Sequence, residues 1–238
     1  MSSLFRYNTA DPIFFPVPEE LDEEMEYVLS EEITLPLLAD AYFHGYFPWP
    51  DPHEKRFIPW ANPRQRGMVL PEDFHIPKTV HRLLKQNRFE LRIDTAAEEV
   101  LRNCSVRPDG EESWITEEII STYLEFHKQG FVHTFEAWNK ETGLLAGGLY
   151  GVSIGGLFAG ESMFYRESGS SKLALAWLGK VLFHCGVKVL DTQMVTPTTE
   201  LFGASYVPRK TYLSLLQKYR STPLTTEQLR TAAKEILP

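Results

Sequence analysis

Apolar residues recur along residues 78–193 with the spacing expected for short helices and strands. Three apolar runs are joined by turns that contain Gly143 and the pair Gly155–Gly156, which is typical of antiparallel hairpins. In chain order, the predicted elements are helix 78–87, strand 89–93, helix 94–104 capped by Asp94, helix 116–130 capped by Thr116, strands 132–138, 145–153 and 157–163, helix 171–185 and strand 187–193. This order predicts an α+β fold with a mostly antiparallel sheet.

The first seventy residues have a different pattern. Prolines predict an irregular course for the first thirty residues, and a helix is predicted at about 35–44, where Thr34 can cap it. Six prolines from residue 47 to 71 predict an extended, loop-like segment with little regular structure. We therefore predict a small N-terminal domain at 1–70 and a larger α+β domain at 71–238.

The composition is that of a globular protein. Of 238 residues, 43% are hydrophobic and 13% are aromatic, which is enough for a sizeable core. No run approaches the roughly twenty apolar residues that a membrane helix needs, so no membrane association is expected. The N-terminus lacks the pattern of a secretory signal, and Cys104 and Cys185 do not make a disulfide framework. We therefore expect a soluble cytoplasmic protein.

Charge is distributed unevenly along this chain, whose net charge is −8. Residues 1–54 carry one basic and twelve acidic side chains, whereas residues 55–92 carry nine basic and three acidic. A local basic band can still attract phosphates, because salt screens charges that lie beyond about 8–10 Å. Charge alone nevertheless favours an ordinary solvated helix surface over a nucleic-acid interface.

Three polar side chains lie where apolar strands end. Glu161 closes the run 156–160, and a carboxylate in that position lies at a cleft or pairs with a cation. Asp191 and Gln193 follow an apolar run, and the period of two puts them on the same face of the strand. Such a pair can position and deprotonate an amine, or simply bind neighbouring backbone groups. The residues alone leave both interpretations open.

The segment Arg166–Lys172 leads into the predicted helix 171–185. Free N–H groups at a helix start can hold a phosphate or a carbonyl oxygen. The segment does not match the nucleotide motif G-x-x-x-x-G-K-[ST], but it comes close to the R-x-x-G-x-[GA] loop of coenzyme A acetyltransferases, with Ser171 in the last position. The run from 157 to 185 thus resembles the acetyltransferase (GNAT) superfamily, although an ordinary helix start explains the loop as well.

Two sets of apolar side chains can be interpreted either as packing residues or as parts of a binding site. Leu175, Leu178 and Leu182 share one face of helix 171–185, which favours a core position over the wall of an apolar pocket. Trp49 and Trp114 lie in predicted loops or helix starts, where they either stack on nucleobases or pack between domains.

Motifs for a metal site or a nucleophilic triad are absent from the sequence. The seven histidines do not form H-E-x-x-H, the two cysteines do not form C-x-x-C, and no G-x-S-x-G occurs. A zinc enzyme or a triad hydrolase is therefore not predicted.

Short segments spread over residues 35–213 together resemble one family. They are Ala41–Trp49 (AYFHGYFPW), Trp60–Arg66 (WANPRQR), Phe74–Lys78 (FHIPK), Ser113–Thr116 (SWIT), Gly147–Val152 (GGLYGV), Gly160–Phe164 (GESMF) with Ser171-Lys172, and Asp191–Gln193 (DTQ) followed by Gly203-Ala204 and Pro208-Arg209. In this order they are similar to the leucyl/phenylalanyl-tRNA–protein transferases, a bacterial family.

The resemblance implies a reaction and its partners. The expected enzyme is an aminoacyltransferase that moves Leu, Phe or Met from aminoacyl-tRNA to proteins with an N-terminal Arg or Lys, which marks them for degradation by the N-degron pathway. No metal or coenzyme is implied. Because the aminoacyl ester is already activated, the enzyme has to position it, take a proton from the amine and stabilise the oxyanion.

The resemblance also implies roles for individual residues. Asp191 polarises Gln193, which orients or deprotonates the attacking amine, and Glu161 helps to hold the cationic acceptor end. Either Gln193 or the ribose 2′-OH of the tRNA handles the proton. The substrate-binding positions include Tyr42, Trp49 and Trp114, and the two tryptophans are expected to contact the terminal adenosine of the tRNA. The other substrate-binding positions form an apolar pocket for the donor side chain, namely Leu149, Phe158, Leu175, Leu178, Leu182 and Leu190. The positions matched to the tRNA acceptor stem are Lys78, Arg82 and Lys85, which implies phosphate contacts with little sequence reading.

The sequence departs from the family pattern at a few positions. Gln86 stands where some members have a basic residue, Leu178 and Leu182 stand where a bulkier Phe occurs, and Thr198 stands where His is frequent. These departures bear on donor or acceptor preference. Two alternatives also stay open, namely a coenzyme A-dependent N-acyltransferase and a non-catalytic tRNA-binding protein.

Overall fold

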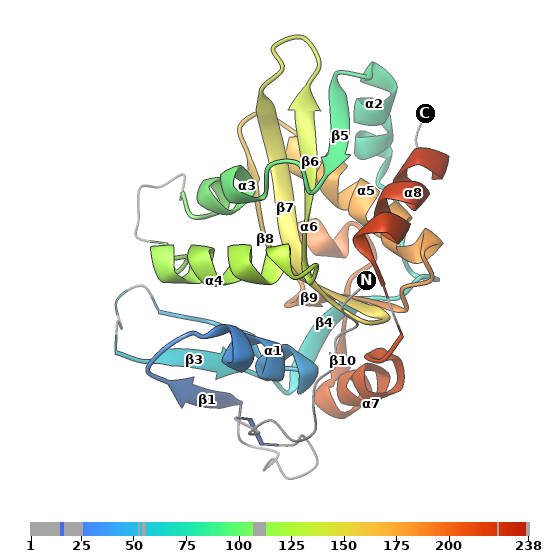
Figure 1. The fold of residues 1–238 in the computed structure, drawn as a ribbon. Helices are drawn as coiled ribbons and strands as arrows, with labels where there is room; N and C mark the ends of the chain where they lie inside the picture. The colour runs from blue at the N-terminus through green and yellow to red at the C-terminus, as the bar shows by residue number, and fades with distance from the viewer. Residues whose placement is uncertain are drawn as a thin grey trace.

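Two sheets of unequal size organise the chain in this computed structural model (Figure 1). The structure describes residues 15–16, 26–51, 53, 56–106, 113–222 and 224–236. The smaller sheet has three strands from the N-terminal region, and the larger has seven. The chain passes from the smaller to the larger sheet at residues 62–64, between β3 (Ile58–Ala61) and β4 (Gln65–Val69).

The smaller sheet is built around β3. β1 (Tyr27–Ser30) and β2 (Phe47–Pro48) pair with it in antiparallel fashion on either side. α1 (Leu35–Phe43) begins at Thr34, whose hydroxyl accepts the N–H of Leu37, and stops before Gly45, whose φ of 85° suits a helix end. Trp60 of β3 is fully buried, so this unit contributes to the core of the whole molecule.

The larger sheet has the strand order β10-β4-β9-β8-β7-β6-β5. Its further strands are β5 (Phe89–Ile93), β6 (Val132–Asn139), β7 (Leu145–Ile154), β8 (Leu157–Tyr165), β9 (Val189–Gln193) and β10 (Ser205–Pro208). Neighbouring strands are antiparallel except β8 and β9, which run parallel. The predicted α+β class with a mostly antiparallel sheet is therefore confirmed.

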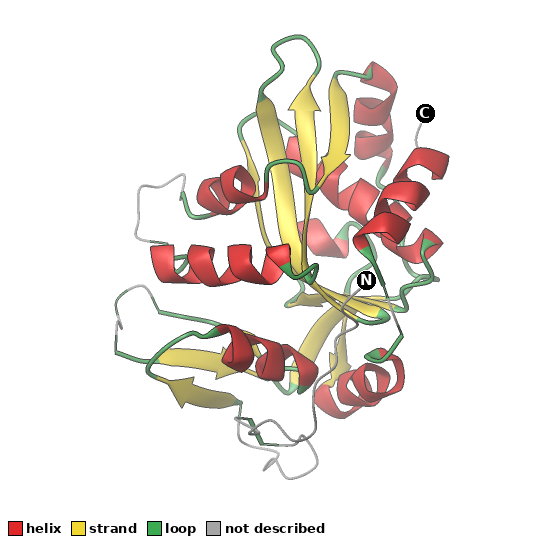
Figure 2. Ribbon diagram, in the orientation of Figure 1, coloured by secondary structure: helices red, strands yellow, loops and turns green. Residues whose placement is uncertain are grey.

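Helices cover both faces of the larger sheet (Figure 2). α3 (Ala97–Cys104) and α4 (Glu117–Lys128) pack in one hydrophobic cluster with α1, whereas α2 (Lys78–Gln86), α5 (Ser170–His184) and α8 (Thr226–Ile236) pack in a second. α6 (Pro197–Glu200) and α7 (Arg209–Tyr219) follow β9 and β10. Within the described ranges, none of these helices has the length and hydrophobicity that crossing a membrane requires.

The prediction of a loop-like segment from residue 47 to 71 is wrong, because β2, β3 and β4 all lie in it. The fixed φ of proline is compatible with extended backbone, and neighbouring residues supply the donors that prolines lack. The N–H of Trp49, for example, donates to the carbonyl of Pro59 at 2.8 Å. Prolines therefore limit the number of hydrogen bonds in this sheet without preventing it from forming.

The prediction that Asp94 caps the helix after it is also wrong. α3 begins three residues later, and Asp94 has a φ of 57° with its Oδ1 accepting the N–H of Thr134 at 2.7 Å. Glu136 of the neighbouring strand instead accepts the N–H groups of Thr95 and Ala96 at 2.9 and 2.8 Å. A carboxylate that is distant in sequence thus replaces the local cap.

The other predicted helices and strands end within two residues of their observed limits. β10 and the helices α6, α7 and α8 were not predicted. The irregular course expected for the first thirty residues lies mostly outside the described residues, but residues 27–30 form β1 by pairing with β3.

Candidate active site

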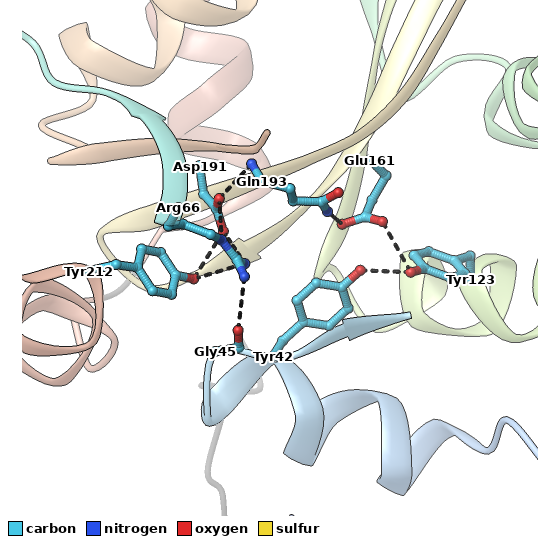
Figure 3. Close-up of polar contacts among 8 residues, drawn as sticks. All are labelled: Tyr42, Gly45, Arg66, Tyr123, Glu161, Asp191, Gln193 and Tyr212. Carbon is cyan, nitrogen blue, oxygen red and sulfur yellow. Dashed lines mark hydrogen bonds and ion pairs between the residues drawn. The ribbon is translucent and has the colours of Figure 1, made fainter. Parts of the chain in front are cut away.

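Asp191 is the centre of a buried polar network at the end of β9 (Figure 3). Its side chain is fully buried. Oδ1 accepts hydrogen bonds from Arg66 Nε and from the N–H of Gln193, both at 2.8 Å, and Oδ2 accepts from Arg66 Nη2 at 2.6 Å and from the hydroxyl of Tyr212 at 2.9 Å. Four donors therefore fix the orientation of this carboxylate.

Arg66, on the neighbouring strand β4, holds the Asp191 carboxylate in place. Its guanidinium carbon lies 4.4 Å from the ring centroids of both Phe47 and Tyr212, and its Nη1 donates to the carbonyl of Gly45 at 3.1 Å. Burial by itself lowers the pKa of Arg66, but the Asp191 carboxylate more than offsets this, so that the pKa is raised. The bidentate pair remains a full ion pair in the interior.

Two β-bulges bring Glu161 and Gln193 together. Tyr150 lies opposite Ser162 and Gly151 opposite Gly160, which leaves Glu161 as the extra residue of β8. On β9, Thr192 is the extra residue, because the adjacent Met68 and Gly67 of β4 lie opposite Asp191 and Gln193. Bulges redirect side chains and commonly lie beside active sites.

The pairing of β8 with β9 ends at Ala159 and Asp191, and side chains bridge the two strands beyond that point. Gln193 Nε2 donates to Glu161 Oε1 at 2.8 Å (Figure 3). Gln193 has a φ of 60°, a conformation that costs energy in a residue other than glycine and that is found at functional sites. With Nε2 engaged by Glu161, the carboxamide oxygen of Gln193 is left as an acceptor for a substrate N–H.

Two tyrosines cover the other oxygen of Glu161. The hydroxyl of Tyr123 on α4 donates to Oε2 at 3.4 Å and lies 2.6 Å from the hydroxyl of Tyr42 on α1. Burial, followed by the Glu161 charge, raises the pKa of both tyrosines well above its ordinary value, so they act as donors at neutral pH. Burial also raises the pKa of Glu161 to about 8, with a further contribution from Asp191. The site thus offers an amide acceptor beside a carboxyl group that a cation would ionise.

The structure brings the six predicted pocket residues into one buried cluster between the larger sheet and α5. They are Leu149, Phe158, Leu175, Leu178, Leu182 and Leu190, each at most 5% exposed. Their role as a side-chain pocket stays a prediction. The three residues expected to bind the acceptor stem, Lys78, Arg82 and Lys85, are all exposed on α2. In the described part of the chain, no group of three or more His, Cys, Asp or Glu side chains is arranged to hold a metal ion.

Two aromatic positions lie on the surface rather than in the buried network. Trp49 is 42% exposed and meets Phe47 edge-on, with ring centroids 6.0 Å apart. Trp114 is half-buried just before α4. Arg66, Tyr123 and Tyr212 were not predicted as site residues. A charged residue within a strand is a signal that a buried partner exists, but the segment that contains β4 was predicted to be loop-like, so this signal was missed for Arg66.

Comparison with known proteins identifies the family. Residues 68–217 match the family model described as leucyl/phenylalanyl-tRNA protein transferase. A protein of that name from Oleidesulfovibrio alaskensis is 36% identical, over 92% of this chain and 89% of its own length. Another, from Lawsonia intracellularis, is 36% identical over 95% of this chain and 97% of its own length. A third, from Chlorobaculum tepidum, is 41% identical over 75% of this chain and 91% of its own length. The chain therefore belongs to the leucyl/phenylalanyl-tRNA–protein transferase family and is an aminoacyltransferase, as its sequence segments predicted.

One solved structure, described as that of L-PGS from Bacillus licheniformis, covers 79% of this chain and 64% of its own with a TM-score of 0.38 and 11% identity. A TM-score this low supports no conclusion about fold or function.

Removing Arg66 is expected to destabilise the protein strongly. In Arg66→Met, the buried carboxyl group of Asp191 loses its counter-ion and two of its hydrogen-bond donors, so the free energy of unfolding in urea should fall by about 3–5 kcal/mol. Arg88→Met is the matched control, because it breaks a pair with Glu167 in which the arginine is 53% exposed, and should cost about 1 kcal/mol or less. Equal losses in the two variants would contradict a structural role for the buried pair.

Glu161 is expected to make stability depend on pH. The pKa of Glu161 is about 8 in the folded state against an ordinary 4.5, so unfolding releases a proton between these values and the free energy of unfolding falls as pH rises through the window. Glu161→Gln should therefore gain stability relative to wild type from pH 5 to pH 8, by on the order of 2 kcal/mol after allowance for partial exposure. Glu118→Gln, on the exposed side of α4, controls for loss of one charge. A difference between Glu161→Gln and wild type that stays constant with pH would disprove the shift.

Proposed function

We propose that this enzyme transfers Leu, Phe or Met from aminoacyl-tRNA to the N-terminal Arg or Lys of acceptor proteins. The observation that carries the proposal is the contact between Gln193 and Glu161, held in place by the buried pair of Asp191 and Arg66. Because of this contact, the amide oxygen of Gln193 and the carboxyl group of Glu161 lie close enough to bind the same acceptor N-terminus. We further propose that transfer marks the acceptor for the N-degron pathway in the cytoplasm.

The chemistry needs little beyond positioning. The α-amino nitrogen of the acceptor attacks the carbonyl carbon of the aminoacyl ester, a C–N bond forms, and the C–O bond to the tRNA ribose breaks. The carboxamide oxygen of Gln193 accepts a hydrogen bond from the amine and aims its lone pair at the ester. Because an amide oxygen is a weak base, the amine proton passes to the departing ribose oxygen, directly or through the 2′-OH or a water molecule.

Glu161 suits the cationic end of the acceptor. A guanidinium or ammonium group near this half-buried carboxyl would favour its ionised form and lower its pKa from the value of about 8. An acidic N-terminal residue would instead meet a like charge at high pH. Acceptors that begin with Arg or Lys are therefore preferred over those that begin with Asp or Glu.

The donor is held by apolar and aromatic groups. The cluster of Leu149, Phe158, Leu190 and three leucines of α5 supplies an environment for an apolar side chain such as Leu, Phe or Met. Trp49 and Trp114 would stack on the terminal adenosine, and Tyr42 would contact the aminoacyl end from α1. The leucines at 178 and 182 leave more room than phenylalanines would.

The fold supports an acetyltransferase-like catalytic domain at 71–238 behind a small N-terminal domain at 1–70. Its support is the single parallel pairing, β8 with β9, which stops at Ala159 and Asp191 within a mostly antiparallel sheet. β4 already belongs to the larger sheet, so the two domains share Arg66 and the site.

Transfer of labelled leucine from charged tRNA to peptides is the direct test. We expect product with peptides that begin with Arg or Lys and none with Asp or Glu. Gln193→Ala should lower kcat by about 100-fold while charged tRNA still binds, because only the positioning of the amine is lost. Product formed from acetyl-CoA instead would favour the N-acyltransferase alternative. Binding of tRNA without transfer in wild type would favour a non-catalytic protein.

The exposed basic side chains of α2 are expected to contact phosphates. Arg82→Ala should weaken tRNA binding and reduce the slope of log affinity against log salt by about one unit. Lys210→Ala on α7 is the control, since α7 lies at the other end of the molecule from α2 (Figure 1). An unchanged slope in Arg82→Ala would remove this residue from the tRNA interface.

A further inference from the structure

β5 forms one edge of the larger sheet, and the backbone groups on its outer side have no partner strand. Among the strands that the structure describes, β5 pairs with β6 alone. The N–H of Asp94, directly after β5, donates to the carbonyl of Thr134 on β6 at 3.2 Å, so the even-numbered residues of β5 face that strand. The N–H and carbonyl groups of Phe89 and Leu91 therefore point to the open edge, where a further strand can pair with them.

A cavity of about 440 Å³ lies next to this edge, and none of the residues that line it has a role in the proposed function. It is enclosed by β5, α2, α5 and α8, and Figure 1 shows α2 and α8 at the β5 side of the sheet. Its apolar lining includes Leu84, Leu91, Leu173 and the half-buried Trp177. Because residues directly opposite one another in a sheet share a face, a strand added to β5 would point the side chain opposite Leu91 into this cavity.

Cations surround the cavity, and its carboxylate is already engaged. Lys180 of α5 and Lys234 of α8 are exposed in the lining, and neither has an ion-pair partner in the described part of the chain. The ammonium group of Lys140 donates to a neutral side-chain amide at 2.6 Å. Glu90 is the acidic residue of the lining, and Arg92 binds both of its oxygens at 3.0 and 2.7 Å. The surroundings of the cavity therefore favour acidic side chains.

The backbone edge, the apolar cavity and the lysines together select one kind of occupant. A second copy of this chain would bring the same lysines together across the paired edges, and like charges oppose such pairing. A nucleic acid would satisfy the lysines, but it has no peptide backbone to continue the hydrogen-bond ladder at Leu91. An extended acidic peptide with an apolar side chain satisfies all three features at once.

We propose that the free edge of β5 binds an extended acidic segment of a partner protein as an additional strand. Main-chain hydrogen bonds to Phe89 and Leu91 supply affinity, and one apolar side chain of the segment fills the cavity beside Trp177. Acidic side chains two residues to either side lie on the same face and reach Lys180 and Lys234. The proposal is independent of the proposed function, because none of these residues is assigned to transfer.

The primary test measures binding of the peptide Glu-Thr-Leu-Thr-Glu to the full-length protein by fluorescence anisotropy. A fluorophore blocks the peptide N-terminus, so the peptide cannot serve as an acceptor. Lys180→Glu combined with Lys234→Glu should weaken binding about tenfold, because two ion pairs become like-charge contacts. Lys210→Glu combined with Lys218→Glu is the matched control, since both lysines are exposed on α7, the change of charge is the same, and binding should be unaltered.

Two modified peptides test strand pairing itself. Alternate N–H groups of a strand point to opposite edges, so N-methylation of the leucine and N-methylation of the two threonines remove different sets of donors. Only one of these peptides should lose binding, by about tenfold, because an added strand turns one of its edges to β5 and leaves the other in water. Attraction between charges alone would leave the two peptides equal.

Several results would each overturn the proposal. They are no saturable binding by wild type, equal binding of Lys-Thr-Leu-Thr-Lys, equal weakening in the α7 control, and the same effect of both N-methylations. Binding of tRNA to the same variants covers the nucleic-acid alternative. If Lys180→Glu with Lys234→Glu weakens tRNA binding while peptide binding is unchanged, the surface serves RNA and the proposal fails.

Discussion

The buried ion pair between Asp191 and Arg66 is the interaction on which the rest of the site depends. Two charges in the interior are stable only when their remaining hydrogen-bonding groups are satisfied. Here Gly45, Gln193 and Tyr212 satisfy them, and the rings of Phe47 and Tyr212 enclose the guanidinium. Because these partners come from the smaller sheet, from β9 and from α7, the pair also holds three parts of the chain together.

The bulges at Glu161 and Thr192 bring the side chains of Glu161 and Gln193 together next to this rigid support. A regular ladder would have kept β8 and β9 paired beyond Ala159, whereas the bulges let the strands part and direct two side chains toward each other. Gly67 makes this possible, because a Cβ there would lie 2.6 Å from the backbone of Met194. The positive φ of Gln193 is the local cost of that geometry.

The distribution of charge shows how an acidic protein can still present a local basic surface. Most of the acidic excess lies in residues 1–54, which carry twelve acidic side chains and one basic, while the exposed basic side chains of α2 lie together on one helix. Screening limits the influence of distant carboxylates, so local donors determine where phosphates bind.

The sequence by itself determined the α+β class, the limits of nine of the eighteen described elements and the residues Glu161, Asp191 and Gln193 as candidates. These follow from local signals, such as the Thr116 cap, the glycine turns and the spacing of apolar residues. Only the tertiary structure decided that Arg66 pairs with Asp191 across 125 residues, that Glu136 and not Asp94 serves the start of α3, and that the proline-rich segment forms strands. The physical reason is that periodicity and capping are local, whereas strand register, bulges and buried charge pairs depend on partners distant in sequence.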